Sequence, residues 1–157
     1  MTSNYLDFED KFRGDREKIL GTLSIYEPLI KLVIQDINSP KLIDVGCGRG
    51  EWLQMWKDRI DDCYGIDSNN NMIRACRENN LQVLEGDAID QLSKFATGTI
   101  TVITIFHVIE HLENKQLLRL IEECQRVLSD DGILIMETPS IDSLLVSTKS
   151  FHLDPTH

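Results

Sequence analysis

Several features are scarce in this chain of 157 residues, and each scarcity excludes a class of protein. Sixteen basic residues face 26 acidic ones, so a net charge of −10 gives no help in binding nucleic acid. No apolar run approaches the length of a membrane span, and no signal-peptide pattern is present. The four cysteines show no C-x-x-C spacing, so we expect reduced, buried thiols. The sequence therefore predicts a soluble, cytoplasmic protein with no nucleic-acid partner.

The chain alternates short β patterns with amphipathic helical patterns, without repeats or low-complexity segments. Its length suits one compact unit with a sizeable core. We expect a helical region over residues 1–39, divided near Pro28, and a loop over residues 140–157. Residues 40–139 contain five strand patterns, near 42–45, 64–67, 83–88, 101–106 and 132–137. This order predicts an α/β fold with a mostly parallel twisted sheet and helices on both faces.

The most informative segment joins the first strand to the next helix. Gly46, Gly48 and Gly50 follow a buried strand at alternate positions, and a helical pattern begins at once. Glycine there lets the backbone pass close to a nucleotide, although the same residues can simply form a tight turn. With Asp44 the pattern is D-x-G-x-G-x-G, which differs from the G-x-G-x-x-G of dinucleotide-binding folds.

This pattern resembles motif I of the class I S-adenosylmethionine-dependent methyltransferases, and residues 40–139 resemble that family in order and spacing. Asp67 ends the second strand, where a carboxylate can accept both ribose hydroxyls. Ser68 is expected to cap the next helix, and Asp87 would accept the amine of adenine. The resemblance implies an S-adenosylmethionine site formed by Asp44, Gly46, Cys47, Gly48, Gly50, Asp67, Ser68, Met72, Asp87, Ala88 and Phe106.

The acids in this set also have simpler explanations. Asp44 can cap the helix that opens near Gly50, and Asp67 can be a residue of the turn that ends its strand. With Asp87, however, they form three acids at three successive strand ends. These ends meet at the carboxyl edge of a parallel sheet, where ligands bind in open α/β folds. We therefore expect the cofactor at that edge.

The resemblance also implies a Rossmann-like class I methyltransferase fold, whose full sheet has seven strands. The sequence provides five, so the two C-terminal strands are expected to be missing from this chain. We interpret the chain as a fragment of a longer protein, or as a domain whose missing edge comes from an oligomeric partner.

Histidine is rare and falls in two short windows. His107 and His111 directly follow the fourth strand, and His152 and His157 lie near the end of the sequence. If a helix begins after the fourth strand, His107, Glu110 and His111 share one face. That face would lie beside the transferred methyl group, and the second window could fold over the same edge. The sequence therefore predicts a catalytic cluster of these three residues.

Three interpretations of the cluster stay open. A histidine can act as a general base that takes a proton from a hydroxyl. Alternatively, Glu110 and His111 can bind a divalent metal, helped by His107 or a later histidine. Their pair resembles that of metal-dependent O-methyltransferases acting on ubiquinone precursors or small-RNA ends. Because the RNA enzymes have a further Glu where this chain has His107, we do not favour a metal. In the third interpretation the pair only caps and solvates a helix.

The flanking residues 8–14 and 151–157 resemble methyltransferase domains of bacterial surface-polysaccharide (O-antigen type) biosynthesis proteins. Such domains are often fused to glycosyltransferases, and the resemblance implies O-methylation of a sugar hydroxyl on a glycan. Arg13 can then face the cofactor's carboxylate, or can be an ordinary solvated charge. The alternatives are a small-molecule O-methyltransferase of the quinone-precursor type and an inactive cofactor-binding module of a larger protein.

Overall fold

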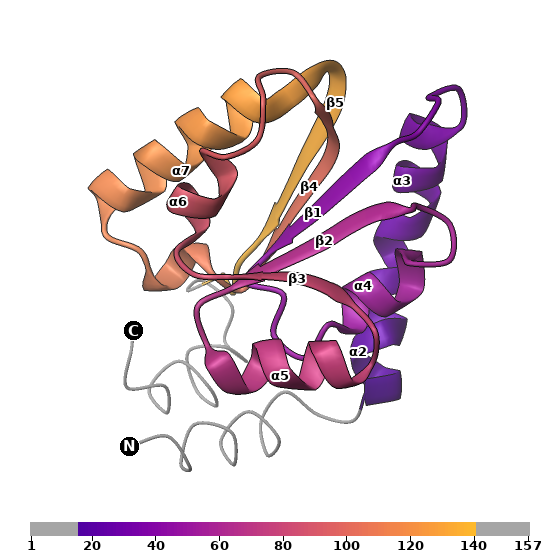
Figure 1. The fold of residues 1–157 in the computed structure, drawn as a ribbon, viewed down its shortest axis with the longest axis horizontal. Helices are drawn as coiled ribbons and strands as arrows, with labels where there is room; N and C mark the ends of the chain where they lie inside the picture. Colours follow the sequence, from indigo (N-terminus) through magenta and orange to yellow (C-terminus); the bar gives the residue numbers. More distant parts are fainter. Residues whose placement is uncertain (1–15, 141–157) are drawn as a thin grey trace.

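A five-stranded parallel sheet forms the centre of the computed structural model, which describes residues 16–140 (Figure 1). The strand order is β3-β2-β1-β4-β5, so the direction of winding reverses between β1 and β4. The strands are β1 (Lys41–Val45), β2 (Asp62–Asp67), β3 (Gln82–Glu85), β4 (Ile100–Phe106) and β5 (Leu128–Glu137). The predicted Rossmann-like α/β fold is confirmed. In such sheets ligands bind beyond the carboxyl ends of the strands, at the reversal point.

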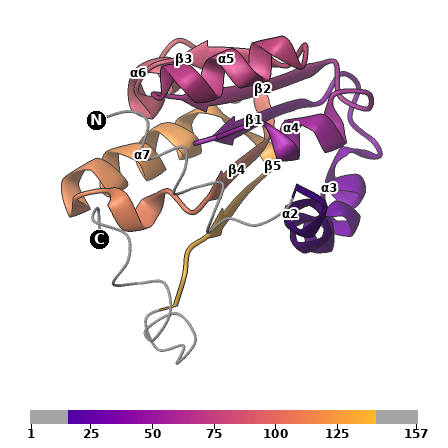
Figure 2. The ribbon, with the colours of Figure 1, turned by 90° about the horizontal axis from the view of Figure 1, so that it is seen from below.

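Helices cover both faces of this sheet. One face carries α2 (Arg16–Leu23), the 3₁₀ helix η1 (Ser24–Tyr26), α3 (Glu27–Ile34), α4 (Glu51–Trp56) and α5 (Asn70–Glu78). The other face carries α6 (Ala88–Leu92) and α7 (Asn114–Val127). In Figures 1 and 2 these two helices lie across the sheet from α2, α3 and α4. The 3₁₀ helix η2 (Ile109–His111) connects β4 to α7. Within residues 16–140, no helix is long and apolar enough to cross a membrane.

Alternation along the strands divides the apolar residues into two cores. In β1, Leu42 packs toward α3 and α4, whereas Ile43 and Val45 pack toward α6 and α7. The interior strand β4 is buried along its whole length, as a parallel strand covered on both faces must be. The indole rings of Trp52 and Trp56 on α4 meet edge to face, 5.6 Å apart, and anchor this helix to the sheet. The two cores hold the strand ends at fixed positions.

Two local expectations are wrong. Ser68 does not cap α5; Asn69 does, with its side chain accepting the Asn71 N–H at 2.9 Å. The cap moves by one residue because Asp67 already fixes the turn by accepting the Asn69 N–H at 2.8 Å. The last strand, expected near residues 132–137, already begins at Leu128, so residues 129–132 lie inside β5. Pairing jumps there from Ile100 with Leu128 to Val102 with Ile133, so these residues form an irregularity within the strand.

The four cysteines are buried, which confirms that part of the expectation, and all four are free thiols in the structure. Burial raises the pKa of Cys63 and that of Cys124 to about 12. The pKa of Cys47 is also raised, first by the hydrogen bond that its thiol donates to Cys76 and then by burial. All three thiols therefore stay protonated near neutral pH, and the thiolate is the reactive form.

We predict that the native chain reacts slowly with a chromogenic disulfide reagent near neutral pH. Burial both hinders access and suppresses the thiolate. In denaturant, all four cysteines should react rapidly and together. Absorbance of the released thiolate measures both rates. A native thiol that reacts as fast as the unfolded chain would contradict this packing.

Candidate functional site

The turn between β1 and α4 contains two glycines at positions where neighbouring side chains leave no room for a Cβ. Gly46 and Gly50 have φ angles of 72° and 79°, in the left-handed region that favours glycine. A Cβ on Gly46 would lie 2.2 Å from Cγ2 of Val108, and one on Gly50 would lie 2.3 Å from Cδ1 of Leu81. These two glycines are therefore needed for the packing of the chain itself, whether or not a ligand approaches.

Asp44 is a buried carboxylate beside this turn. Only 3% of it is exposed, and its Oδ1 accepts the hydroxyl hydrogen of Thr104 on β4 at 2.8 Å. The N-cap of α4 is Gly50, without a side-chain cap, so the interpretation of Asp44 as a helix cap is wrong. Thr104 is itself fully buried, and the bond fixes the carboxylate at the boundary between β1 and β4. Asp44 thus lies at the reversal point of the sheet.

Asp67 connects the glycine turn to the end of β2. Its Oδ2 accepts the Gly48 N–H at 2.9 Å, and its Oδ1 accepts the Asn69 N–H at 2.8 Å. A carboxylate has about four lone-pair directions, so these two bonds leave capacity for further donors such as ribose hydroxyls. The carboxylate is only partly buried and can be reached by a ligand. The structure therefore gives Asp67 a role in the turn and leaves its predicted ribose contact possible.

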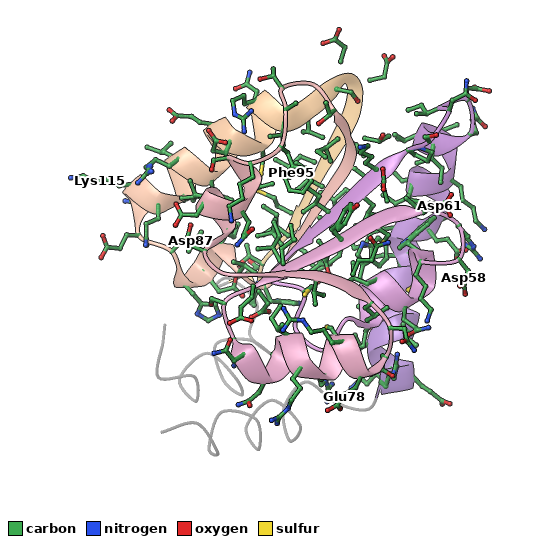
Figure 3. All side chains as sticks on the ribbon, viewed as in Figure 1. Asp58, Asp61, Glu78, Asp87, Phe95 and Lys115 are labelled. Atoms are coloured by element: carbon green, nitrogen blue, oxygen red, sulfur yellow. The ribbon has the colours of Figure 1, made fainter. Side chains whose placement is uncertain are left out.

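Asp87 caps a helix. Its Oδ1 accepts the N–H groups of Ile89 and Asp90 at 2.8 and 3.1 Å, and the residue lies exposed at the start of α6 (Figure 3). Its predicted contact with adenine stays a prediction. Of its neighbours in the predicted set, Ala88 begins α6, and Met72 is buried in α5.

A cavity of about 160 Å³ opens beside the glycine turn. We call it the site cavity. It brings together the ends of β1, β4 and β5 with α4 and α2. Its lining residues are Asp44, Gly46, Cys47, Glu51, Trp52, Phe106, His107 and Glu137, with Lys18, Ile19, Thr22 and Leu23 of α2 on one side. The cavity therefore joins part of the predicted cofactor set to one predicted catalytic residue.

The prediction that His107, Glu110 and His111 share one face of a helix is wrong. The chain leaves β4 with His107 at a φ of 56°, and η2 begins only at Ile109. The reason is that the His107 N–H bonds to the carbonyl of Glu137 at 2.8 Å, which extends the strand pairing by one residue. His107 still meets Glu110, with Nδ1 3.7 Å from Oε1. His111 is exposed and does not line the site cavity.

Two residues of this region were missed by the sequence prediction. Glu137 ends β5, and its Oε1 lies 3.4 Å from Nε2 of His107. The hydroxyl of Tyr26 on η1 donates to the other oxygen of Glu137 at 2.5 Å. The position of Glu137 at a strand end is the same signal that identified Asp67. Tyr26 gives no such signal, because it belongs to the apolar stripe of the N-terminal helices.

The pKa values of this cluster reflect its carboxylates. The hydrogen bond to Glu137 raises the pKa of Tyr26 to about 12, and burial and the carboxylate charge act in the same direction. Burial of Glu110 acts to raise its pKa. The neighbouring imidazole of His107, first, and the hydrogen bond from the Thr138 hydroxyl outweigh that effect, so the pKa of Glu110 lies below its usual value and the group is ionised at neutral pH. At neutral pH the Tyr26 hydroxyl therefore remains a hydrogen-bond donor, and Glu110 carries a negative charge.

The other predictions lie elsewhere. Arg13, His152 and His157 lie outside the described residues. Among residues 16–140, no three His, Cys, Asp or Glu side chains are grouped so that they could hold a metal ion.

Comparisons with known proteins agree on the family. The profile of the methyltransferase domain matches residues 43–136. The crystal structure of an S-adenosylmethionine-dependent methyltransferase from Archaeoglobus fulgidus is 34% identical, covers 98% of this chain and superposes with a TM-score of 0.86. The PH0226 protein from Pyrococcus horikoshii is 26% identical over 85% of this chain, with a TM-score of 0.68. The sugar N-methyltransferase KedS8 from Streptoalloteichus is 18% identical over 86%, with a TM-score of 0.64.

The chain belongs to the S-adenosylmethionine-dependent methyltransferases of class I. It spans 66%, 60% and 53% of the lengths of these three structures. No curated protein sequence matches it significantly.

We predict that Thr104→Val lowers the free energy of unfolding by about 1–3 kcal/mol, because the buried carboxylate of Asp44 loses a hydrogen bond. Thr104→Ser is the matched control, since it keeps the hydroxyl and loses only a methyl group. Urea denaturation of both variants measures the effect. If Thr104→Val is as stable as Thr104→Ser or more so, the bond to Asp44 does not stabilise the site.

Proposed function

We propose that this chain binds S-adenosylmethionine at the carboxyl edge of β1, β2 and β4 and transfers its methyl group to a sugar hydroxyl of a bacterial polysaccharide. The observation that supports this most directly is the site cavity, because the glycine turn and His107 line the same space. Methyl transfer needs the donor and the acceptor's base side by side. The proposed setting is the cytoplasm, with a fused glycosyltransferase or an oligomeric partner.

Residues in the site cavity and at the neighbouring strand ends suit the parts of the cofactor. Asp67 has lone pairs left for the ribose hydroxyls, and Asp87 would meet the adenine. Asp44 places a buried carboxylate where positive charge is favoured. Lys18 on α2 is the cationic side chain of the described lining, and it could face the cofactor's carboxylate in addition to Arg13. When bound, the cofactor supplies an electrophilic methyl group on a positively charged sulfur.

The task left to the protein is to align the acceptor and remove its proton. His107 is suited to this task because its imidazole lines the cavity and its side chain is 44% exposed, so it can also return a proton to solvent. Glu110 lies 3.7 Å from that imidazole and stabilises its protonated form. The role of His111 is weaker, since it lies off the cavity wall.

Two other functions stay as alternatives. The fold alone does not select the acceptor, because it also occurs in the sugar N-methyltransferase named above. A small-molecule hydroxyl of the quinone-precursor type would use the same base. An inactive cofactor-binding module would keep the glycine turn but would have no use for His107 in the cavity.

The test is incubation of the chain with isotopically labelled S-adenosylmethionine and a bacterial glycan extract, followed by mass spectrometry. The proposal expects label on a sugar oxygen. Label on a quinone precursor supplied in parallel selects the first alternative. Cofactor binding by calorimetry, with no labelled product from any acceptor, selects the second.

We predict that Asp67→Ala weakens binding of S-adenosylhomocysteine by about 1–3 kcal/mol, the cost of losing hydrogen bonds to a charged group. Asp62→Ala is the control, because Asp62 begins the same strand at the opposite edge of the sheet. Calorimetric titration measures both dissociation constants. Equal affinities for the two variants would remove Asp67 from the site.

We predict that His107→Ala lowers the methylation rate about 10²- to 10⁴-fold, the usual contribution of a general base. Its affinity for S-adenosylhomocysteine should change little. His111→Ala is the matched control from the same segment and should keep most of the rate. A larger loss in His111→Ala, or a rate abolished by a chelator and restored by a divalent ion, would favour the metal interpretation instead.

A further inference from the structure

Glu137 links two segments that are far apart in the sequence. One carboxylate oxygen accepts the hydroxyl of Tyr26, and the other lies 3.4 Å from Nε2 of His107. The backbone reinforces the contact, because Phe106 pairs with Glu137 and the His107 N–H bonds to its carbonyl. Its side chain is 27% exposed, so the carboxylate is held mainly by protein groups.

Tyr26 can act on Glu137 only as a donor. Its pKa of about 12 keeps the phenol protonated at any physiological pH. The ring stacks on Phe106 with centroids 5.5 Å apart, and Phe106 meets Trp52 edge to face at 5.3 Å. This aromatic packing holds the phenol in place under the carboxylate. One oxygen of Glu137 is therefore occupied, which leaves the other directed to His107.

His107 is held between two carboxylates. Glu137 faces Nε2 at 3.4 Å, and Glu110 faces Nδ1 at 3.7 Å. A neutral imidazole has one N–H and one lone pair, so it can donate to only one of them. The nearer acceptor is Glu137, which places the N–H on Nε2 and the lone pair on Nδ1. The left-handed backbone at His107 is the local strain that this arrangement maintains.

We propose that Glu137 is a positioning residue for His107 and that Tyr26 fixes its orientation. The inference rests on the proposed function, in which His107 removes the acceptor's proton. Glu137 holds the Nε2–H tautomer, so Nδ1 takes that proton and the ring becomes an imidazolium. The carboxylate of Glu137 stabilises this charge, as the carboxylate of a catalytic triad does. The proton then leaves to solvent from the exposed ring.

The tautomer is tested without activity by nitrogen NMR of the imidazoles in the full chain, with His107→Ala to identify the signals. The proposal expects Nε2–H in the wild type and a changed tautomer population in Glu137→Gln. The same substitution should lower the pH of the Tyr26 titration toward 10.0, followed by ultraviolet absorbance with Tyr26→Phe as reference. Identical His107 signals in wild type and Glu137→Gln would overturn the proposal.

The kinetic test uses labelled S-adenosylmethionine with a panel of methyl glycosides and nucleotide-linked sugars. Glu137→Gln should lower kcat about 10- to 100-fold, the range for a group that orients another, with KM for the cofactor unchanged. Tyr26→Phe, which keeps the carboxylate, should lower kcat less. Exposed Glu78→Gln is the control.

The outcomes separate the two claims. A rate lost in His107→Ala but normal in Glu137→Gln overturns this inference alone. A rate unchanged in His107→Ala overturns the proposed function and, with it, the catalytic use of the tautomer. If no acceptor of the panel is methylated, the NMR result decides whether Glu137 positions His107.

Discussion

The parallel pairing of β1 with β2 on one side and β4 on the other is the constraint on which the site depends. Because the strands run in one direction, Asp44, Asp67 and His107 reach the same edge although the sequence separates them widely. The pairing of β4 with β5 then adds Glu137 beside His107. Each of these residues lies in or directly after the last two positions of a strand, so the sheet determines their spacing more closely than any local motif does.

Several carboxylates lie together at the carboxyl edge of the sheet. The chain as a whole is acidic, and its acids at the sheet edge are tied down by specific donors: Thr104 for Asp44, Gly48 and Asn69 for Asp67, and Tyr26 for Glu137. Such bonds hold the carboxylates in fixed orientations in a partly buried setting. A cationic sulfonium donor suits that environment. The carboxylates beside His107 likewise favour the charge that develops on the imidazole when it takes a proton.

The sequence predicted the sheet because its strands are short, apolar and bounded by turn residues, and it predicted the cofactor edge because the acids follow those strands. It failed where a tertiary contact overrides local preference. His107 was expected to begin a helix, but its N–H is taken by Glu137 of β5. Ser68 was expected to cap α5, but the bond between Asp67 and Asn69 moves the cap by one residue. Tyr26 looked like a core residue because the pattern of its helix cannot reveal a partner 111 positions away.

The central claim is that the glycine turn and His107 form one site. NMR titration of the isotopically labelled chain with S-adenosylhomocysteine tests it most directly. The account predicts saturable shifts of the backbone amides of Gly46, Gly48 and Asp67 and of the ring of His107, with the opposite edge of the sheet at Lys41 and Asp62 unchanged. Shifts confined to another surface, or a saturated turn with an unaffected His107, would contradict it.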